Sequence, residues 1–327
     1  MSETKTPAPD LIPVTVLTGY LGAGKTTLLN RILSEQHGRK YAVVINEFGE
    51  LGVDNDLVVD TDEEVFEMNN GCICCTVRGD LIRIVGGLMK RRDKFDGIII
   101  ETTGLANPAP VAQTFFVDEG VRARTRLDAV VTVVDAKNLP ARLEDSHEAE
   151  DQIAFADVIV LNKTDLVTPE ELDDVERRIR AINKFATIHR TQRAALPIEQ
   201  VLDRGAFDLN RVLSFAPDFL KDDEHEHNDD IGSMSFEAQK PIDPEKFNAW
   251  IGLLLQEKGQ DLLRTKGILA YAGDDRRFAF QAVHMMADGD FIGPWKQGEP
   301  RVSRIVFIGR NLNRPQLRRG FEGCQVG

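Results

Sequence analysis

The sequence Gly19-Tyr20-Leu21-Gly22-Ala23-Gly24-Lys25-Thr26 follows the apolar run Leu11–Thr18 and opens the helix-forming segment Thr26–Glu35. Its spacing is that of the phosphate-binding loop G-x-x-x-x-G-K-[ST], whose glycines let backbone N–H groups turn toward a β-phosphate. Lys25 supplies a positive charge for the β- and γ-phosphate oxygens, and the Thr26 hydroxyl can ligate Mg²⁺. A nucleotide is therefore expected to contact Gly19, Gly22, Ala23, Gly24, Lys25, Thr26 and Thr27.

Apolar segments alternate with segments of helical composition through the N-terminal part of the chain. Strands are predicted at Leu11–Thr18, Tyr41–Ile45, Phe95–Ile100, Ala129–Val134 and Val158–Leu161. Helices are predicted at Thr26–Glu35, Asp80–Arg91, Pro110–Phe116, Glu148–Phe155 and Pro169–Asn183. This alternation predicts an α/β fold of the P-loop NTPase kind, with a doubly wound, mainly parallel sheet and functional loops at the carboxyl ends of its strands.

A polar segment, Glu101-Thr102-Thr103-Gly104, comes directly after the predicted strand Phe95–Ile100. A carboxylate at a strand end beside a phosphate loop can hold Mg²⁺ through water, and a nearby backbone amide can sense the γ-phosphate. The sequence identifies no catalytic base, but phosphoryl transfer depends mostly on positioning and electrostatics. The expected catalytic residues are Lys25, Thr26, Glu101 and Gly104, with Thr26 and Glu101 on magnesium.

A second polar segment, Asn162-Lys163-Thr164-Asp165, comes after the predicted strand Val158–Leu161. The Asp165 carboxylate can accept hydrogen bonds from guanine N1–H and from the guanine 2-amino group, a donor pair that adenine lacks. The sequence therefore favours GTP over ATP. Thr191–Ala195 is a weaker candidate for closing the other side of the base. The residues expected at the base are Asn162, Lys163 and Asp165.

Three of the four cysteines are crowded into Cys72-Ile73-Cys74-Cys75. Thiolates are soft ligands that favour Zn²⁺ or a related ion over Mg²⁺. A closed tetrahedral site needs a fourth ligand, which could come from Glu47 or Glu50, from water, or from another protein, and an incomplete shell suits a site from which the metal leaves. The other readings are small buried apolar residues or a redox-reactive thiol cluster. The expected zinc ligands are Cys72, Cys74, Cys75 and Glu47.

The acidic stretch KDDEHEHNDD at residues 221–230 separates this part of the chain from the rest. It offers almost no apolar surface to bury, so it predicts a mobile linker. Beyond it, strands are predicted at Gly232–Glu237, Leu269–Tyr271, Phe278–Val283 and Val302–Gly309, and helices at Pro244–Leu255 and Arg314–Phe321. The predicted organisation is a flexible N-terminus at 1–10, a P-loop GTPase domain at 11–204, an acidic linker at 205–231, and a small α+β domain with a mainly antiparallel sheet at 232–327.

Composition narrows the expected partners and location. The net charge of −13 and the pI near 5.0 argue against broad nucleic-acid binding, which needs a basic face. Residues 1–10 lack the apolar core of a secretory signal, and no run approaches the ~18–20 apolar residues that cross a bilayer. We therefore expect a cytoplasmic protein without nucleic-acid or membrane partners. Arg310, Arg314, Arg318 and Arg319 are expected to form a solvated helix face, and Cys324 to be a surface or packing thiol.

Taken together, several segments resemble the CobW-type family of metallochaperone GTPases, in particular its zinc-transferring branch. They are Gly19–Thr27 (GYLGAGKTT), Asn46–Glu50 (NEFGE), Asn70–Asp80 (NGCICCTVRGD), Glu101–Gly104 and Asn162–Asp165, with Arg264–Gly267 and Arg304–Gly309 similar to the C-terminal domain of that family. The resemblance implies a P-loop GTPase domain, a small α/β domain, Mg²⁺-dependent GTP hydrolysis and binding of Zn²⁺ or Co²⁺ at the C-x-C-C motif. Many members carry a long His-rich linker, of which only His225 and His227 remain here.

The leading hypothesis is a GTPase that transfers zinc to client metalloproteins. GTP and Mg²⁺ would order the loops at Glu47 and Gly104 and complete the thiolate site, and hydrolysis would loosen it. One alternative in the same class handles cobalt for cobalamin synthesis or nitrile hydratase. Another is a regulatory GTPase whose metal is merely structural. The expected partner is a client metalloprotein, and a homodimer is left open.

Overall fold

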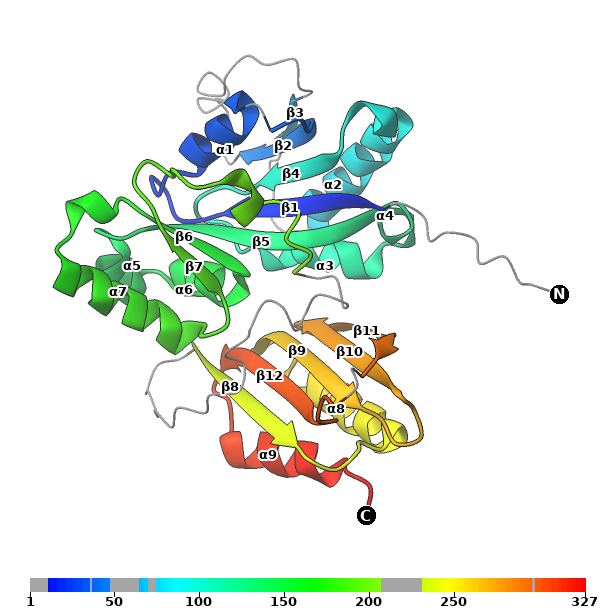
Figure 1. Ribbon diagram of the computed structural model, residues 1–327. Coiled ribbons are helices and arrows are strands. Elements are labelled where there is room, and N and C mark those ends of the chain that lie inside the picture. The colour runs from blue at the N-terminus through cyan, green and yellow to red at the C-terminus, as the bar shows by residue number, and fades with distance from the viewer. Residues whose placement is uncertain (1–10, 36, 48–64, 70–74, 207–230, 296–297) are drawn as a thin grey trace.

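The computed structural model describes residues 11–35, 37–47, 65–69, 75–206, 231–295 and 298–327. These residues form two sheets, each with its own helices (Figure 1). The expected flexible N-terminus and most of the expected acidic linker lie outside the described residues. No helix among the residues listed above is both long and apolar enough to cross a bilayer.

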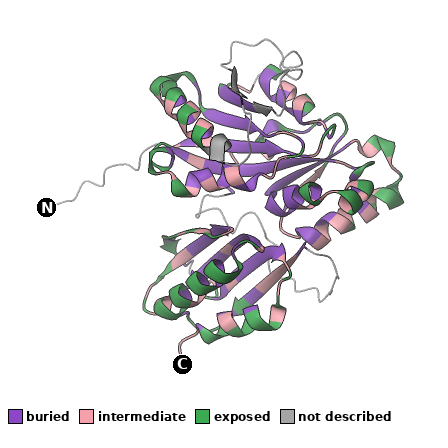
Figure 2. Ribbon diagram, turned by 180° about the vertical axis from the view of Figure 1, so that it is seen from behind, coloured by how far each residue is buried: buried purple, intermediate pink, exposed green. Residues whose placement is uncertain are grey.

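The N-terminal sheet has seven strands in the order β3-β2-β4-β1-β5-β6-β7, and every neighbouring pair is parallel. Its central strands are near-continuous runs of Val, Ile and Leu because helices cover both faces, and Figure 2 shows these strands buried along their length. The predicted doubly wound, mainly parallel α/β sheet is confirmed. The strands are β1 (Ile12–Thr18), β2 (Tyr41–Glu47), β3 (Val65–Asn69), β4 (Gly97–Glu101), β5 (Thr125–Asp135), β6 (Val158–Asn162) and β7 (Thr187–Arg190).

The last helix of this part of the chain begins at a clear start signal in the sequence. There Thr168 and Glu171 form a reciprocal capping box, with Pro169 in the first turn. The sequence does not predict the edge strands β3 and β7, nor the short helices α4 and α5. The helices are α1 (Lys25–Ser34), α2 (Cys75–Leu88), α3 (Ala109–Val117), α4 (Glu119–Arg122), α5 (Leu139–Asp145), α6 (His147–Phe155) and α7 (Pro169–Ile182).

The C-terminal sheet has five strands in the order β11-β10-β9-β12-β8, and every neighbouring pair is antiparallel. Two helices cover one of its faces around an aromatic core that includes Phe247, Phe307 and Phe321. Cys324 packs in this core, where its thiol contacts the Gly320 carbonyl at 3.1 Å. The predicted small α+β domain is confirmed. Its elements are β8 (Ile231–Ala238), α8 (Pro244–Lys258), β9 (Leu262–Ala270), β10 (Arg276–Val283), β11 (Met286–Pro294), β12 (Ser303–Arg310) and α9 (Arg314–Gly323).

The other face of the C-terminal sheet packs against the N-terminal part of the molecule. Strands β8, β9, β10 and β11 contact helices α3, α6 and α7, and Figure 1 shows the C-terminal sheet directly beside these helices. Leu263, Val306 and Ile308 belong to the same buried apolar cluster as the strands of the N-terminal sheet. The two sheets therefore share part of one core, which favours a fixed arrangement over independent motion.

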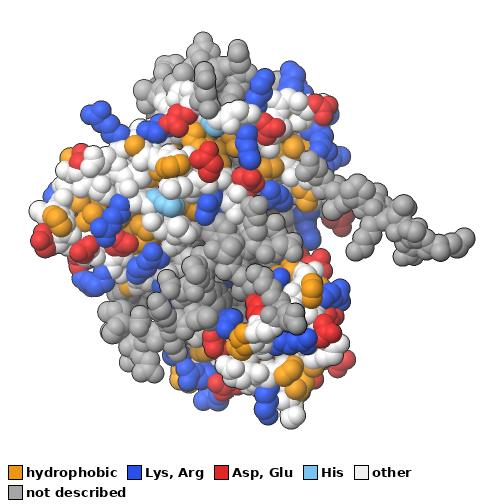
Figure 3. Space-filling model, viewed as in Figure 1, with side chains coloured by type: hydrophobic (Ala, Val, Ile, Leu, Met, Phe, Trp, Pro, Cys, Tyr) orange, Lys and Arg blue, Asp and Glu red, His pale blue; other side chains and the backbone are white. Residues whose placement is uncertain are grey.

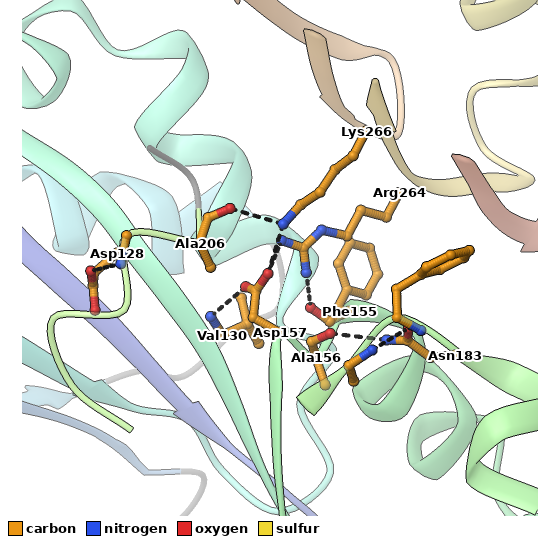
Figure 4. Close-up of polar contacts among 12 residues, drawn as sticks. Asp128, Val130, Phe155, Ala156, Asp157, Asn183, Ala206, Arg264 and Lys266 are labelled. Carbon is orange, nitrogen blue, oxygen red and sulfur yellow. Dashed lines mark hydrogen bonds and ion pairs between the residues drawn. The ribbon is translucent and has the colours of Figure 1, made fainter. Parts of the chain in front are cut away.

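A buried ionic cluster lies within this contact (Figure 4). The Asp157 carboxylate, just before β6, accepts from the Arg264 guanidinium at 2.5 Å and from the Lys266 ammonium at 2.9 Å. Arg264 also donates to the Phe155 carbonyl at 2.5 Å, and Lys266 donates to the Ala206 carbonyl at 2.8 Å. The cluster thus joins β9 to α6, to the start of β6 and to Ala206.

The charges in this cluster shift one another's ionisation. Burial opposes ionisation of Asp157, but Arg264 and Lys266 outweigh it, so the pKa of Asp157 lies below its usual value. Burial and the neighbouring Arg264 lower the pKa of Lys266 to about 8, against the opposing effect of Asp157. The cation therefore depends on Asp157 to stay charged inside the contact.

The cluster also explains where the prediction for β9 was wrong. The sequence predicts a short strand at Leu269–Tyr271, whereas β9 spans Leu262–Ala270. Arg264 and Lys266 interrupt the apolar pattern, but their charged ends lie in the contact and not in solvent. Charged residues inside a strand therefore concealed most of its length.

Arg310 is a second correction. It was expected on a solvated helix face with Arg314, Arg318 and Arg319, but it is the last residue of β12. Its guanidinium forms an ion pair with Asp151 of α6, across the contact between the two sheets.

Candidate functional site

The loop between β1 and α1 has the backbone geometry of a tight phosphate cradle. Gly19 has a φ of 141°, and a Cβ there would lie 2.2 Å from the Val133 carbonyl oxygen. Gly24 has a φ of 112° and caps α1. Only glycine meets both demands without strain. The Lys25 ammonium lies over this loop and donates to the Gly19 carbonyl at 2.9 Å.

Asn162, at the end of β6, connects the phosphate loop to the loop after β7. Its side-chain amide donates to the Ala23 carbonyl at 3.0 Å. Its side-chain oxygen accepts from the Ala194 amide at 2.8 Å and from the Thr191 hydroxyl at 3.2 Å. The structure thus brings Thr191–Ala195, the weaker sequence candidate, directly against the expected base-binding segment.

Lys163 extends this connection. It adopts a left-handed conformation with a φ of 60°, and its ammonium donates to the Gly22 carbonyl at 2.8 Å and to Asp135 at 2.7 Å. Partial burial of Asp135 opposes ionisation, but bonds from Lys163 and Asn138 outweigh it and lower the pKa of Asp135. Sequence reasoning missed Asp135, although its position at the carboxyl end of a predicted strand was a usable signal.

Asp165 follows in a short 3-10 turn, Thr164–Leu166, and is exposed. Thr164 fixes the start of that turn, because its backbone N–H and its hydroxyl both donate to the Thr191 carbonyl, at 3.2 and 3.0 Å. The carboxylate therefore lies on the outer side of the Asn162–Ala194 connection, where a flat base could reach it.

The segment after β4 lies against the phosphate loop. Glu101, the last residue of β4, is buried and stands level with Leu17 of β1. The Thr102 hydroxyl donates to the Thr18 hydroxyl at 2.8 Å. A Cβ on Gly104 would lie 2.6 Å from Leu21 Cγ, so this position tolerates only glycine. The structure therefore brings the expected Mg²⁺ and γ-phosphate residues together with the phosphate loop.

A cavity of about 390 Å³ borders the outer side of the phosphate loop. Its wall includes Tyr20 and Leu21 from the loop, Asp135 from the end of β5, and Arg142 and Gln152 from the helices that follow. The Arg142 guanidinium lies 5.4 Å from the centre of the Tyr20 ring, a cation–π contact. The cavity adjoins the phosphate loop through Tyr20 and Leu21, and its lining includes none of the residues that the sequence predicts to contact the nucleotide.

Of the Cys72–Cys75 motif, the structure describes only the backbone of Cys75. Cys75 is the first residue of α2, and Glu47 is the last residue of β2, where it pairs in register with Asn69 of β3. Cys72, Cys74 and Glu50 lie outside the described residues, as do His225 and His227. Within the described residues, no cluster of three or more His, Cys, Asp or Glu side chains could hold a metal ion.

Positive and negative side chains are mixed on the one face of the molecule that Figure 3 draws. On the face in Figure 3, Lys and Arg side chains alternate with Asp and Glu side chains across the residues that the structure describes.

Two family models match the chain. Residues 13–190 match the model described as the CobW/HypB/UreG nucleotide-binding domain, and residues 231–325 match the Cobalamin synthesis protein cobW C-terminal domain. The chain belongs to the CobW family. The resemblance seen in its motifs is therefore confirmed, and the two matched regions coincide with the two sheets of the CobW fold described above.

Characterised CobW-family relatives match over almost the whole chain. The zinc chaperone YjiA of Escherichia coli (strain K12) is 37% identical over 96% of this chain and 99% of its own length. The zinc-regulated GTPase metalloprotein activator 1 of Schizosaccharomyces pombe is 36% identical over 93% of this chain and 84% of its own length. The crystal structure of the Zn(II)-bound YjiA GTPase from E. coli superposes with a TM-score of 0.78 at 32% identity, covering 97% of this chain and 99% of that chain.

Proposed function

We propose that this CobW-family chain is a GTPase that binds zinc at its Cys72–Cys75 motif and passes the zinc to a client metalloprotein. The observation that carries the proposal is the shared carboxyl edge of the parallel sheet. Leu17 of β1 and Ile45 of β2 both pair in register with Glu101 of β4. The phosphate loop, the Mg²⁺ candidate and the strand that ends in Glu47 therefore leave the sheet side by side.

The proposed nucleotide chemistry follows from these positions. Lys25, close to the loop carbonyls, would move onto the β- and γ-phosphates. Thr26 and Glu101 stand on neighbouring elements at the strand ends and fit the ligand set of Mg²⁺, which neutralises phosphate charge when bound. The Gly104 amide, held against the phosphate loop, would bind the γ-phosphate.

The proposed metal chemistry uses the same edge. Zinc is the cargo, held by soft thiolates with Glu47 as the candidate fourth ligand. We infer that the γ-phosphate orders the chain near Glu47 and Gly104 and completes the zinc site, and that hydrolysis to GDP loosens it. The names of the relatives, a zinc chaperone and a zinc-regulated metalloprotein activator, support a role in metal delivery.

Replacing Cys72, Cys74 and Cys75 together with alanine is expected to lower zinc affinity by more than about 100-fold, because the soft ligands are lost. Affinity for a GTP analogue is expected to stay within about twofold in zinc-free buffer, since the phosphate loop is unchanged. Isothermal titration of zinc and nucleotide measures both. Cys324→Ala, which removes the thiol in the C-terminal core, is the matched control and should keep full zinc affinity.

Two outcomes would contradict this part of the proposal. Unfolding of the triple variant would favour a purely structural metal. Equal zinc affinity of the parent chain with a GTP analogue, with GDP and without nucleotide would show that the two sites are not coupled. Repeating the titration with Co²⁺ in competition identifies the preferred cargo.

Asp165→Asn is expected to weaken GTP affinity by about 100-fold or more, because the N1–H and the 2-amino group of guanine lose their carboxylate acceptor. Affinity for xanthosine triphosphate should rise in the same variant, since the asparagine amide can donate to the xanthine C2 carbonyl. Competition binding with the two nucleotides measures this change of preference from GTP to xanthosine triphosphate. Weaker binding of both nucleotides would contradict the assignment of Asp165 to the base.

A further inference from the structure

Helix α6 carries two adjacent polar residues that face different parts of the molecule. Gln152 is almost fully buried, with 1% of its surface exposed. Its side-chain amide donates to the Gly104 carbonyl at 3.1 Å and to the Ala106 carbonyl at 3.2 Å. A single side chain therefore fixes two carbonyls of the loop that follows β4.

Asp151, the preceding residue, joins that loop to the C-terminal sheet. One of its carboxylate oxygens accepts from the Asn107 side-chain amide at 2.8 Å. The other accepts from the Arg310 guanidinium at the end of β12. Asn107 is itself fixed, because its side-chain oxygen accepts from the Ala109 amide in the first turn of α3 at 2.8 Å. Asp151 therefore contacts both the loop and Arg310, which is 159 positions away in the sequence.

The same loop reaches the phosphate loop at its other end. Thr102 contacts Thr18 through their hydroxyls, and Gly104 lies against Leu21 closely enough to exclude any side chain. A continuous set of contacts therefore runs from the phosphate loop through residues 102–107 and α6 to β12.

We propose that Gln152, Asp151 and Arg310 are positioning residues for GTP hydrolysis, through which the C-terminal domain sets the geometry of the γ-phosphate loop. This inference rests on the GTPase activity proposed above. Arg310 keeps Asp151 charged and oriented, Asp151 holds Asn107, and Gln152 holds the Gly104 peptide. The Gly104 amide is then presented to the γ-phosphate without further rearrangement.

The electrostatics support this division of roles. Burial raises the pKa of Asp151, and Arg310 is the main opposing influence. Without Arg310 the buried carboxylate loses its charge-assisted hydrogen bond and accepts more weakly from Asn107. The alternative reading, a plain ion pair that only fastens one domain to the other, predicts a change in stability but no change in nucleotide selectivity.

The experiment compares two arginines of β12 in the full chain. Arg310→Ala breaks the contact with Asp151, and Arg304→Ala, the matched control, breaks an ion pair with Glu237 that lies wholly within the C-terminal sheet. The kcat and KM for GTP are measured, together with affinities for a non-hydrolysable GTP analogue and for GDP. Arg310→Lys tests rescue, and Asn107→Ala with Arg310→Ala forms a double-mutant cycle.

We expect Arg310→Ala to lower kcat about 5- to 20-fold and to weaken the GTP analogue about fivefold more than GDP, because only the triphosphate uses the Gly104 amide. Arg304→Ala should match the parent chain. Arg310→Lys should recover part of the loss, and the double variant should lose little more than the weaker single variant, because both act through Asp151.

Other results overturn the inference. The ratio of GTP-analogue affinity to GDP affinity could be the same in Arg310→Ala and Arg304→Ala. The Arg310–Asp151 ion pair would then only hold the two domains together. Independent, multiplying effects in the double variant would show that Asn107 and Arg310 do not act through one carboxylate. A parent chain without GTPase activity would instead overturn the proposed function, and the affinity ratio would still decide the role of Arg310.

Discussion

Lys25→Ala is expected to lower kcat/KM for GTP by at least about 10²–10³-fold, because it removes the one side-chain cation of the phosphate loop. The Lys25 ammonium bonds within the loop to the Gly19 carbonyl, and the charge it would place on the β- and γ-phosphates is strongest in the transition state. Phosphate release measured over a range of GTP concentrations separates the loss in kcat from the change in KM.

The variant should fold like the parent chain, since the backbone of the phosphate loop is shaped by Gly19 and Gly24 and not by the lysine. Lys258→Ala removes an exposed lysine at the end of α8 and serves as the matched control. Hydrolysis by Lys25→Ala at more than about a third of the parent rate would place the nucleotide elsewhere in the molecule.

Asp157→Ala is expected to reduce the free energy of unfolding by about 3–5 kcal/mol, because it removes the fully buried carboxylate that both Arg264 and Lys266 contact between the two sheets. Asp173→Ala removes an exposed carboxylate that pairs with Arg190, and this control should cost at most about 1 kcal/mol. Urea unfolding of the three chains gives the comparison.

The loss in Asp157→Ala should become smaller as the pH rises toward about 8. In the parent chain the pKa of Lys266 is about 8, below its value in the unfolded chain, so the unfolded state binds more protons above that pH and stability rises with pH. Without Asp157 the pKa of Lys266 falls further, so deprotonation relieves the repulsion at a lower pH. A deficit that is constant between about pH 6 and about pH 8 would show that Lys266 does not carry the effect.

The sequence predicted secondary structure correctly where the signal comes from residues that are adjacent along the chain. The apolar runs at Val14, Ile98 and Val158 predicted buried parallel strands, because both faces of such strands need apolar side chains. The edge strand β7 was missed since three of its four residues are only half-buried and the fourth is exposed, which weakens any periodic pattern. In β9 the misleading feature was a pair of cations, Arg264 and Lys266, whose charged ends contact Asp157 and not solvent.

In the candidate site, too, the sequence identified residues that are neighbours along the chain and missed residues that meet only in the fold. The glycines and Lys25 were identified because a phosphate loop is one contiguous turn. Asp135 and Gln152 were not, since nothing near them in the sequence indicates that they reach Lys163 and the Gly104 carbonyl. The zinc roles of Cys72, Cys74, Cys75 and Glu47 stay predictions that the proposed titrations test.

The amino-acid sequence by itself determined the phosphate loop, the alternation of the central strands with helices and the family resemblance, because each depends on motifs whose residues lie close together along the chain. Only the tertiary structure decided which distant residues meet. Asp157 and Arg264 are 107 positions apart, and Asn162 and Ala23 are 139 apart. Such contacts depend on the order of the strands in the sheet and on how the second sheet packs against the first. The pattern of apolar residues along the sequence shows which segments are buried, but it does not show which segments become neighbours.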